Sequence, residues 1–463
     1  MRTQLSQITV THMDIHQFYD EGLAHASYAI RNGDQVALID PARNPKQYLD
    51  FAAHHGAKII AVIETHPHAD FVSSHLELHH LTGATIYTSA LAGAEYPHQP
   101  FDENVRIALD DVWLEAINTP GHSPDSICVL LADSRNKPHA VFTGDTLFVG
   151  DVGRPDLRER VGNITQKATE LARQLYRSIR EKLMHLPADV IVYPAHGPGS
   201  LCGKNMGDAR HSTIGTEISS NYALQPMDED KFVALILEQQ PFIPRYFEYD
   251  VMLNKKGAPT FQASLEAIPM LTDLSNRDPK VLIVDGRPQS SFQSGHFPGA
   301  FNIPNGPRFE TWLGSIVDPG EAFYLLATDE KQVQVLLEKA AKIGYERQIA
   351  ATAVVTGGTV HAPTLDESHF LQRQEDYTIV DIRNRGEAAS RRIFTNAIHI
   401  PLPELREQVT EIPKGKPVVV HCAGGYRSAI GASIIAAALP GTTVIDMGMR
   451  IQAFNPADEC GRS

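Results

Sequence analysis

The sequence has few cysteines, no long apolar run and a deficit of positive charge, and each shortage argues against a class of protein. Its four cysteines include no Cys-x-x-Cys pair, which argues against a disulfide framework or a structural zinc knuckle. No apolar run approaches the ~20 residues that span a bilayer, and the first residues lack the long apolar stretch of a signal peptide. The net charge of −14 argues against nucleic acid as the main partner. We therefore expect a cytoplasmic protein that binds neither a membrane nor nucleic acid.

The length of the chain indicates several domains. A chain of 463 residues exceeds what one hydrophobic core organises, and about two to four domains are expected. The pattern breaks near residues 255–259, where we place a boundary. Beyond it, residues 281–287 resemble residues 378–383, and each segment is followed by an apolar strand and a helical stretch, at 322–342 and 418–439. Two such copies fit two small α/β domains. We expect domains at residues 1–256, 257–364 and 365–463, with residues 365–376 as a linker region.

Four apolar runs in the first half of the chain each end at a histidine or an aspartate. Residues 58–64 read as a buried strand, and the loop after them carries His66. Similar runs lead into His122, Asp145 and His196, in the contexts Thr-Pro-Gly-His-Ser, Thr-Gly-Asp-Thr-Leu-Phe and Tyr-Pro-Ala-His-Gly. Binding sites in open α/β sheets gather at the carboxyl ends of strands. The four strand ends therefore predict one shared metal site.

The first of these loops departs from a common metal-binding signature at one position. His66, His68 and Asp70 have the spacing of H-x-H-x-D-H, but Phe71 stands where the final histidine would be. A phenyl ring cannot donate to a metal, so a second ion loses one ligand while the ligands of the first ion remain. This favours a single open metal centre over a two-zinc hydrolase.

His66, His122 and Asp145 form a 2-His-1-carboxylate set. Such a set leaves about three positions open on octahedral iron(II), so that a substrate and dioxygen can bind side by side. The same ligands would also accept zinc or manganese. The motifs quoted above resemble those of the metallo-β-lactamase superfamily, in the form found in persulfide dioxygenases, over about residues 5–250.

The resemblance implies an αββα sandwich with one Fe(2+) per chain, bound by His66, His122 and Asp145. It also implies neighbouring groups that orient these ligands and two residues that hold the substrate. The orienting groups would be His68, Asp70 and His196, and the substrate-binding residues would be Arg154 and Tyr193. Cys202, in the Gly-rich loop after His196, is either an auxiliary thiol near the channel or an unreactive buried cysteine.

The second copy of the repeat contains a loop suited to a sulfur anion. The segment Val-Val-Val-His-Cys422-Ala-Gly-Gly-Tyr-Arg427-Ser428 predicts a strand, a glycine-containing loop and a helix that starts near Ser428. The loop N–H groups, the helix N-terminus and Arg427 would lower the thiol pKa and stabilise a persulfide. The segment resembles the active-site loop of rhodaneses, with Cys422 and Arg427 as catalytic residues. The four residues between them, one fewer than in the related phosphatases, favour sulfur transfer over phosphate hydrolysis.

The first copy resembles a rhodanese in residues 284–287 and 295–304, but its counterpart of the loop, residues 325–331, has no cysteine. Asp329 and Glu330 are acidic where a sulfur anion would lie, so we expect this copy to have no catalytic role. The expected fold class is therefore α/β: an αββα metallo-β-lactamase sandwich followed by two rhodanese-like domains with parallel sheets.

Together the two resemblances imply a fused persulfide dioxygenase and thiosulfate sulfurtransferase of sulfide detoxification. The iron would oxidise a persulfide of glutathione, coenzyme A or a similar thiol to sulfite with dioxygen. Cys422 would transfer sulfane sulfur, forming or using thiosulfate, and the direction of sulfur flow stays open. Two alternatives remain: a glyoxalase-II-like thioester hydrolase with an appended sulfurtransferase, and a sulfur carrier or sensor with Cys422 as its only active group. We expect a homo-oligomer, either a dimer or a tetramer.

Overall fold

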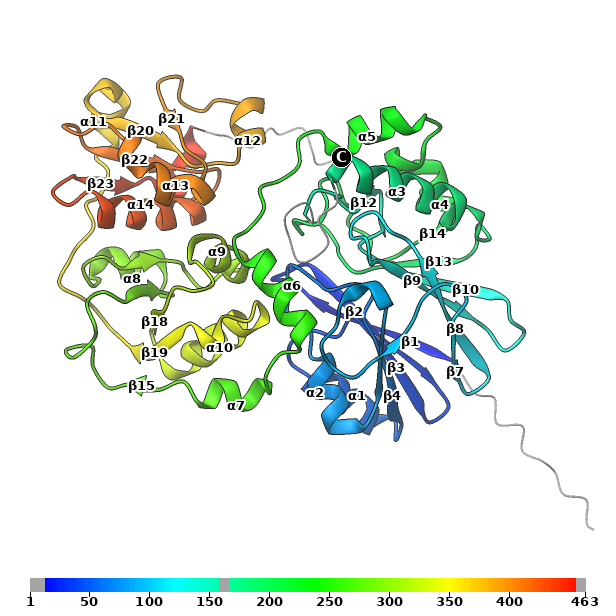
Figure 1. Cartoon of the computed structure of the whole chain (residues 1–463). Coiled ribbons are helices and arrows are strands. Elements are labelled where there is room, and N and C mark those ends of the chain that lie inside the picture. Colours follow the sequence, from blue (N-terminus) through cyan, green and yellow to red (C-terminus); the bar gives the residue numbers. More distant parts are fainter. Residues whose placement is uncertain (1–12, 158–166, 455–463) are drawn as a thin grey trace, which may run out of the picture. The chain divides into compact units, whose positions relative to one another are not determined.

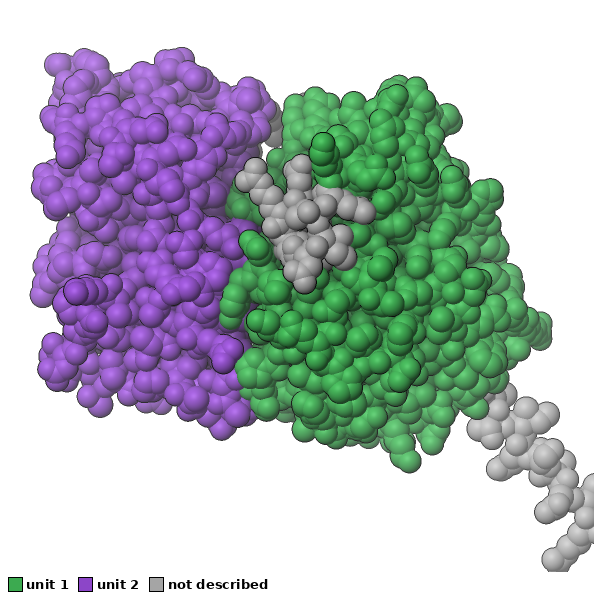
Figure 2. All heavy atoms as spheres, viewed as in Figure 1, with its two compact units in different colours: residues 1–243, 247–261 green, residues 244–246, 262–463 purple. Residues whose placement is uncertain are grey.

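A computed structural model of the protein describes residues 13–157 and 167–454 (Figure 1). Cys460 and the first residues of the chain, on which the signal-peptide expectation rests, lie outside this part. The chain divides into two compact units, residues 1–243 with 247–261 and residues 244–246 with 262–463 (Figure 2). Among the described residues, no helix is long and apolar enough to cross a membrane.

Unit 1 contains two six-stranded sheets. The first has the order β1-β2-β3-β4-β5-β6, and the second has the order β14-β13-β10-β9-β8-β7. The strands of the first sheet are β1 (Asp14–Asp20), β2 (His25–Asn32), β3 (Gln35–Ile39), β4 (Lys58–Ile63), β5 (Thr85–Thr88) and β6 (Gln99–Pro100). Those of the second are β7 (Arg106–Leu109), β8 (Val112–Asn118), β9 (Ile127–Ala132), β10 (Pro138–Gly144), β13 (Ile191–Pro194) and β14 (Ser212–Thr213).

The two sheets pack face to face around one core, and helices cover their outer faces. Tyr28 and Ile63 from the first sheet share a buried cluster with Val129 and Phe142 from the second. The outer face of the first sheet packs on Tyr48 and other residues of the flanking helices, and the outer face of the second packs on a separate group of helices. The flanking helices are α1 (Lys46–His54) and α2 (His75–Thr82) on one side, and α3 (Ala168–Glu181), α4 (Ile214–Ser220) and α5 (Glu229–Leu237) on the other. The layers confirm the expected αββα sandwich.

The alternation of side chains along β2 explains why this strand lies between two apolar layers. Tyr28 and Ile30 point into the core between the sheets, while Ala29 points to the helix side. Successive side chains of a strand face opposite ways, so a strand covered on both faces is apolar at nearly every position. Ser27, on the helix side, makes a 2.6 Å hydrogen bond with the hydroxyl of Tyr48.

Unit 2 contains two parallel sheets with the same strand order. The first is β15-β19-β18-β16-β17, and the second is β21-β20-β22-β23. Apart from β15, each strand of the first sheet has a counterpart in the second. Read from its other edge, the first sheet has the order β17-β16-β18-β19, which corresponds to β21-β20-β22-β23. The strands are β15 (Met270–Leu271), β16 (Leu282–Asp285), β17 (Phe301–Asn302), β18 (Phe323–Ala327) and β19 (Ile349–Val354), then β20 (Thr378–Asp381), β21 (Ile398–His399), β22 (Val418–His421) and β23 (Val444–Asp446).

Helices connect the strands of both sheets in unit 2. In the first copy these are α8 (Gln289–Ser294), α9 (Phe309–Ile316) and α10 (Glu330–Lys342). In the second they are α11 (Glu367–Gln372), α12 (Arg385–Ser390), α13 (Leu405–Gln408) and α14 (Tyr426–Ala438). The remaining elements are the hairpin of β11 (Leu147–Phe148) and β12 (Asp151–Val152) in unit 1, and the helices α6 (Tyr246–Lys256) and α7 (Phe261–Glu266).

The two copies in unit 2 also share one buried ion pair in detail. Arg287 donates to Asp285, with an Nη2–Oδ2 distance of 2.7 Å, and to a carbonyl eight residues further on. Arg383 donates to Asp381 in the same way, at 2.6 Å, and again to a carbonyl eight residues further on. The two copies that the sequence indicates therefore share the same pattern of hydrogen bonds.

The segment expected to be a linker, residues 365–376, belongs to the core of the second copy instead. It contains the helix α11, which begins directly after Asp366. The side chain of Asp366 caps this helix by accepting a hydrogen bond from the backbone N–H of His369. Phe370 of this helix is fully buried in a cluster with Ile379 and Val419 of the sheet. The polar composition of the segment suggests a linker, but one buried aromatic side chain anchors the segment in the core.

Candidate metal centre and sulfur loop

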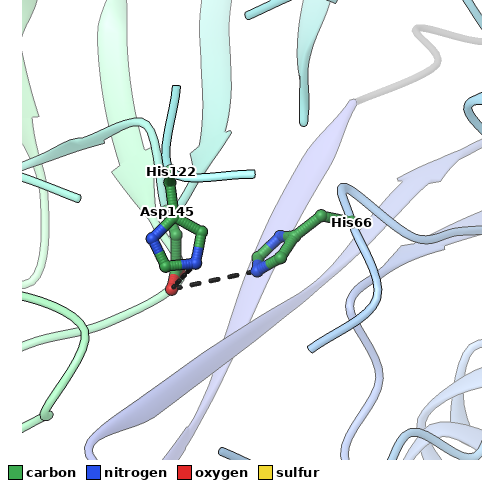
Figure 3. Close-up of side chains that lie close together, drawn as sticks. All are labelled: His66, His122 and Asp145. Carbon is green, nitrogen blue, oxygen red and sulfur yellow. Dashed lines mark ion pairs between the residues drawn. The ribbon is translucent and has the colours of Figure 1, made fainter. Parts of the chain in front are cut away.

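Three of the four strand-end motifs converge on one buried point in unit 1. His66 follows β4, His122 lies between β8 and β9, and Asp145 follows β10. The Oδ2 atom of Asp145 lies 3.5 Å from Nε2 of His122 and 3.9 Å from Nε2 of His66 (Figure 3). Each of the three residues is 2% exposed. The sequence-predicted set thus comes together, although its role in metal binding stays a proposal.

The backbone beside Asp145 requires a glycine. Gly144 has a φ of +49°, a conformation that L side chains rarely adopt. A Cβ atom there would also lie 2.5 Å from Oγ1 of Thr65, the residue before His66. The glycine of the Thr-Gly-Asp motif therefore lets the strand end that carries Asp145 approach the loop that carries His66.

The distance from Asp145 to His122 is close to the separation of two ligands on one metal ion, and the distance from Asp145 to His66 is longer. Two ligand atoms about 2.1 Å from one ion stand about 3.0 Å apart at a right angle and about 3.4 Å apart at a tetrahedral angle. Nδ1 of His122 donates to the carbonyl of Arg154 at 2.9 Å. The hydroxyl of Thr65 donates to Asp40 at 2.8 Å and accepts from Nδ1 of His66 at 3.0 Å. In both imidazoles the Nδ1 proton is thus engaged, and the Nε2 lone pair faces Asp145, as ligation requires.

The charge state of Asp145 also suits a metal ligand. Burial alone would raise the pKa of this carboxyl, but the positive charge that His196 and His122 carry when protonated outweighs it and lowers the pKa below its usual value. The group is therefore an ionised carboxylate at neutral pH, and its two oxygens face different histidines. Oδ2 faces the triad, while Oδ1 lies 3.4 Å from Nε2 of His196.

His68 points away from the triad toward two carboxylates. Its Nε2 atom lies 3.0 Å from Oδ1 of Asp40 and 3.5 Å from Oε2 of Glu64. Burial would lower its pKa, but Asp40 and then Glu64 raise it to about 9. The Nε2 atom of His68 thus contacts Asp40 and Glu64, so this side chain supports the loop rather than the triad. Burial raises the pKa of Glu64 to about 8, and this carboxyl accepts a hydrogen bond from Ser73 at 2.7 Å.

A second buried group lies on the other side of Asp145 and consists of Asp70, His196 and Cys202. One ligand atom from each lies within 4.8 Å of the others. Nε2 of His196 is 3.3 Å from Oδ2 of Asp70. Burial, followed by the charges of Asp145 and Asp70, raises the pKa of the Cys202 thiol well above its usual value. Phe71 takes no part in the group and packs its ring against His25, with 3.7 Å between ring centroids.

The two predicted substrate-binding residues differ in their surroundings. The guanidinium of Arg154 is buried and donates to Asp156 and to the carbonyls of Leu201 and Pro241. Tyr193 is half-buried, and its ring stacks on Phe142 with 5.3 Å between centroids. Burial raises the pKa of its hydroxyl. Substrate contact by either residue stays a prediction.

The sulfur loop in unit 2 has the conformation expected around a sulfur anion. Cys422 follows β22, and its Sγ atom accepts a hydrogen bond from the N–H of Gly425 at 3.1 Å. Gly425 has a φ of +93° and precedes the first residue of α14. Arg427, in the first turn of that helix, makes two hydrogen bonds with Glu387, at 2.6 and 2.7 Å. Burial lowers the pKa of Arg427, but Glu387 and Cys422 raise it.

The corresponding loop of the first copy is shorter and acidic. Sheet register aligns Leu326 with His421, because they pair with Asp285 and Asp381 of the shared motif. Three residues then separate Leu326 from the start of α10, where four separate His421 from the start of α14. Asp329 caps α10 by accepting from the N–H of Gln332 at 2.8 Å. Ala327 stands in the position of Cys422.

Sequence reasoning missed two residues that structure places beside these sites. Asp40 ends an apolar strand, which is the signal that identified the other site residues and could have found it too. Glu387 has no such signal, since it lies within a short polar helix and approaches Arg427 only through the fold.

Two family models match separate parts of the chain. The model of the metallo-beta-lactamase superfamily matches residues 20–196, which include all four strand-end motifs. Unit 1 has the metallo-β-lactamase fold. The model of the rhodanese-like domain matches residues 365–450, which include Cys422. A rhodanese-like domain therefore follows the metallo-β-lactamase domain.

Known proteins match the chain at modest identity. A crystal structure of a metallo-beta-lactamase from Staphylococcus aureus subsp. aureus COL matches with a TM-score of 0.66 and 29% identity, and covers 75% of this chain and 99% of that one. Human persulfide dioxygenase ETHE1, mitochondrial, is 30% identical over 169 residues, which are 36% of this chain and 60% of that protein. The probable metallo-hydrolase YqgX of Bacillus subtilis (strain 168) is 27% identical over 192 residues, which are 37% of this chain and 84% of that protein.

Proposed function

We propose that this protein oxidises thiol persulfides to sulfite at an iron(II) site in unit 1 and moves sulfane sulfur through Cys422 in unit 2. The observation that carries the proposal is the triad of His66, His122 and Asp145, whose two Nε2 atoms and carboxylate face one point. The similarity to human persulfide dioxygenase supports this reading, and Phe71, which stands where the H-x-H-x-D-H pattern has its final histidine, disfavours a two-metal hydrolase. The Cys-less copy, at residues 257–364, has no catalytic role and lies in sequence between the two active domains at 1–256 and 365–463.

When bound, iron(II) supplies open coordination positions beside the triad and a route for electrons from sulfur to dioxygen. The reaction balances as R–S–SH, dioxygen and water giving R–SH, sulfite and two protons. The sulfane sulfur loses four electrons, and dioxygen gains them. The carrier R is glutathione, coenzyme A or a thiol of similar size.

The residues around the triad hold it in this geometry. Thr65 and the carbonyl of Arg154 engage the Nδ1 protons of the two histidines, so each imidazole keeps its Nε2 lone pair directed inward. The burial of all three residues excludes bulk water from the reacting sulfur. The guanidinium of Arg154 is bound to Asp156 and two carbonyls. Its main role is therefore to hold in place the loop whose carbonyl accepts a hydrogen bond from His122. Contact with the anionic carrier then falls to Tyr193 and to the remaining N–H of Arg154.

Sulfur transfer at Cys422 requires no net oxidation. The Cys422 thiolate attacks the sulfane sulfur of a persulfide or of thiosulfate, forms a cysteine persulfide and releases the thiolate or sulfite. Attack of sulfite on the outer sulfur then gives thiosulfate and restores the Cys422 thiolate. The N–H of Gly425 and the first turn of α14 stabilise the anionic sulfur in both states.

Metal analysis and oxygen uptake test the proposal together. We expect purified protein to hold one iron per chain and to consume dioxygen with glutathione or coenzyme A persulfide, with sulfite as a product. The variant His66→Ala should lose iron and lower the rate by at least about 100-fold, while His54→Ala, on the exposed face of α1, should match wild type. Hydrolysis of lactoylglutathione by zinc-loaded protein, without oxygen uptake by iron-loaded protein, would overturn the proposal in favour of a thioester hydrolase.

A further inference from the structure

The Cys-less copy of unit 2 contacts the sulfur loop of the second copy directly, and the proposed sulfur transfer gives this contact no role. Tyr426 is the first residue of α14 and precedes Arg427. The residue before it, Gly425, donates its N–H to Cys422. The hydroxyl of Tyr426 donates to the carbonyl of Pro304 at 2.7 Å. A residue of the sulfur loop is therefore hydrogen-bonded to the other copy.

The first copy is shaped to receive the ring of Tyr426. Burial raises the pKa of the tyrosine hydroxyl, so this group stays protonated and can donate. A Cβ atom at Gly306 would lie 2.7 Å from Cε2 of the ring, a distance that side chains do not reach unless a neighbour shifts. Lys339 of α10 donates to the carbonyl of Gly306 and to Oδ1 of Asn305, both at 2.8 Å. The segment that follows β17 is thereby held against the ring.

A second contact joins the two copies beside the sulfur loop. The side-chain amide of Gln289, the first residue of α8, donates to Oδ2 of Asp446. The other carboxylate oxygen of Asp446 accepts from the N–H of Gly448 at 2.8 Å. Gly448 lies against the loop, because a Cβ atom at Gly425 would be 2.8 Å from its carbonyl carbon. The two contacts thus reach neighbouring residues of the sulfur loop, Gly425 and Tyr426.

We propose that the Cys-less copy positions the sulfur loop, with Tyr426 and Gln289 as positioning residues for sulfur transfer at Cys422, an inference that rests on the function proposed for that cysteine. Gly425 has a φ of +93°, and a short loop in this conformation directs its N–H at sulfur only while both of its ends keep their places. The strand β22 fixes the end at Cys422, and the contacts with the first copy fix the end at Tyr426. The copy without a cysteine thus acts on the reaction through the loop.

The variant Tyr426→Phe tests this role, because it removes only the hydroxyl that joins the two copies. The full-length variant is compared with wild type in sulfur transfer from thiosulfate to cyanide. Alkylation of Cys422 by iodoacetamide is then followed as a function of pH, by mass spectrometry of the peptide that contains this cysteine. We expect a transfer rate about three- to tenfold lower, as for the loss of one hydrogen bond. The alkylation profile should move to higher pH, because a displaced N–H of Gly425 stabilises the thiolate less.

Two further variants separate positioning from packing. Gln289→Met keeps the length of the side chain but cannot donate, and it should show both changes. Gly320→Ala adds a methyl group to the same copy at a place where no atom lies within 4 Å, and it should match wild type in both measurements. A contact that only stabilises the fold would lower the thermal midpoint and leave the alkylation profile in place.

In Tyr426→Phe, a transfer rate within about twofold of wild type or an alkylation profile that stays in place would each overturn the proposal. If this variant fails to fold, Gln289→Met decides the matter by the same two measurements. A wild-type protein that transfers no sulfur from thiosulfate would instead contradict the function proposed for Cys422.

Discussion

At the scale of single residues, the hydrogen bond at one ring nitrogen decides what each buried histidine of unit 1 can do. His66 and His122 give their Nδ1 protons to oxygen atoms and turn Nε2 toward Asp145. His68, two positions after His66, lies against Asp40 and Glu64, which raise its pKa to about 9. His75 lies at the start of α2 in a buried pocket beside Tyr96, where no charge is tolerated. Neighbouring groups thus give the same side chain three different electrostatic environments.

The neutral state of His75 makes the stability of unit 1 depend on pH. Burial, and then the charges of His68 and Arg43, lowers its pKa from 6.5 to about 3. Between these values the unfolded chain binds a proton that the folded chain does not, so the free energy of unfolding falls as pH falls. The loss is about 1.4 kcal/mol for each pH unit below 6.5.

Urea unfolding at pH 7.5 and pH 5.5 measures this effect. His75→Asn removes the titrating group, so the difference in unfolding free energy between the two pH values should shrink by about 1.4 kcal/mol relative to wild type. His54→Asn, which changes an exposed histidine of α1, serves as the control and should leave the difference as it is in wild type. An unchanged pH dependence in His75→Asn would show that His75 carries a proton in the folded state.

At the scale of elements, the junction between a strand and a helix determines whether a copy of the repeat can hold sulfur. In the second copy, Gly425 precedes α14 and directs its N–H at Cys422. In the first copy, Asp329 occupies the corresponding junction and directs its carboxylate at the start of α10. The helix N-terminus attracts negative charge in both cases. One copy leaves that place to the sulfur of Cys422, and the other fills it with its own carboxylate.

Replacing Gly425 by alanine should damage the sulfur loop. Its φ is +93°, and a Cβ atom would lie 2.8 Å from the carbonyl carbon of Gly448 and 2.9 Å from the backbone nitrogen of Met449. Backbone strain and displacement of the Cys422 loop should cost about 1–3 kcal/mol and lower the rate of sulfur transfer from thiosulfate to cyanide at least about tenfold.

Gly424→Ala is the matched control, because a Cβ atom at this neighbouring position meets no atom within 4 Å. Its thermal midpoint should stay close to that of wild type, and its loss of transfer rate should be much smaller. Equal losses in the two variants would mean that the loop tolerates no added methyl group for another reason than backbone conformation.

At the scale of the whole molecule, the chain combines a site that would make sulfite with a thiol that would carry sulfane sulfur. Each unit has its own buried clusters, and the predicted reacting groups, the triad in unit 1 and Cys422 in unit 2, are buried. The product of the first reaction, sulfite, is a nucleophile for the persulfide formed in the second. The two reactions are therefore chemically compatible within one chain.

The products formed by variants report on this combination. Wild-type protein given persulfide and dioxygen should yield thiosulfate in addition to sulfite. Cys422→Ser should consume dioxygen at the wild-type rate but yield sulfite alone, and His66→Ala should lose oxygen uptake while keeping transfer from thiosulfate to cyanide. Chromatography of the sulfur anions measures the partition. Thiosulfate formation or cyanide transfer by Cys422→Ser would contradict both the assigned role of Cys422 and the inactivity of the first copy.

Local sequence patterns were enough to predict many of the elements and candidate site residues of this protein. Strand periodicity, the residues at strand ends and the glycines before helices depend on neighbours within a few positions, so they could be read directly. In this way the sequence alone predicted two small α/β domains in unit 2, the meeting of His66, His122 and Asp145, and the loop around Cys422. The αββα sandwich and the parallel sheets were implied by the resemblance of the motifs to two known families. The segment at residues 365–376 was misjudged because a short helix with one buried aromatic residue has little periodic signal.

Tertiary structure alone decided the relations between distant residues. It turned the ring of His68 toward Asp40, paired Arg427 with Glu387, committed Arg154 to Asp156 and two carbonyls, and placed Cys202 beside Asp70 and His196. Each of these outcomes depends on burial and on the direction of a side chain, and both arise only when segments far apart in the chain pack together. Residue types and their spacing therefore determined the candidate chemistry. Packing determined which atom of each side chain points into the candidate site.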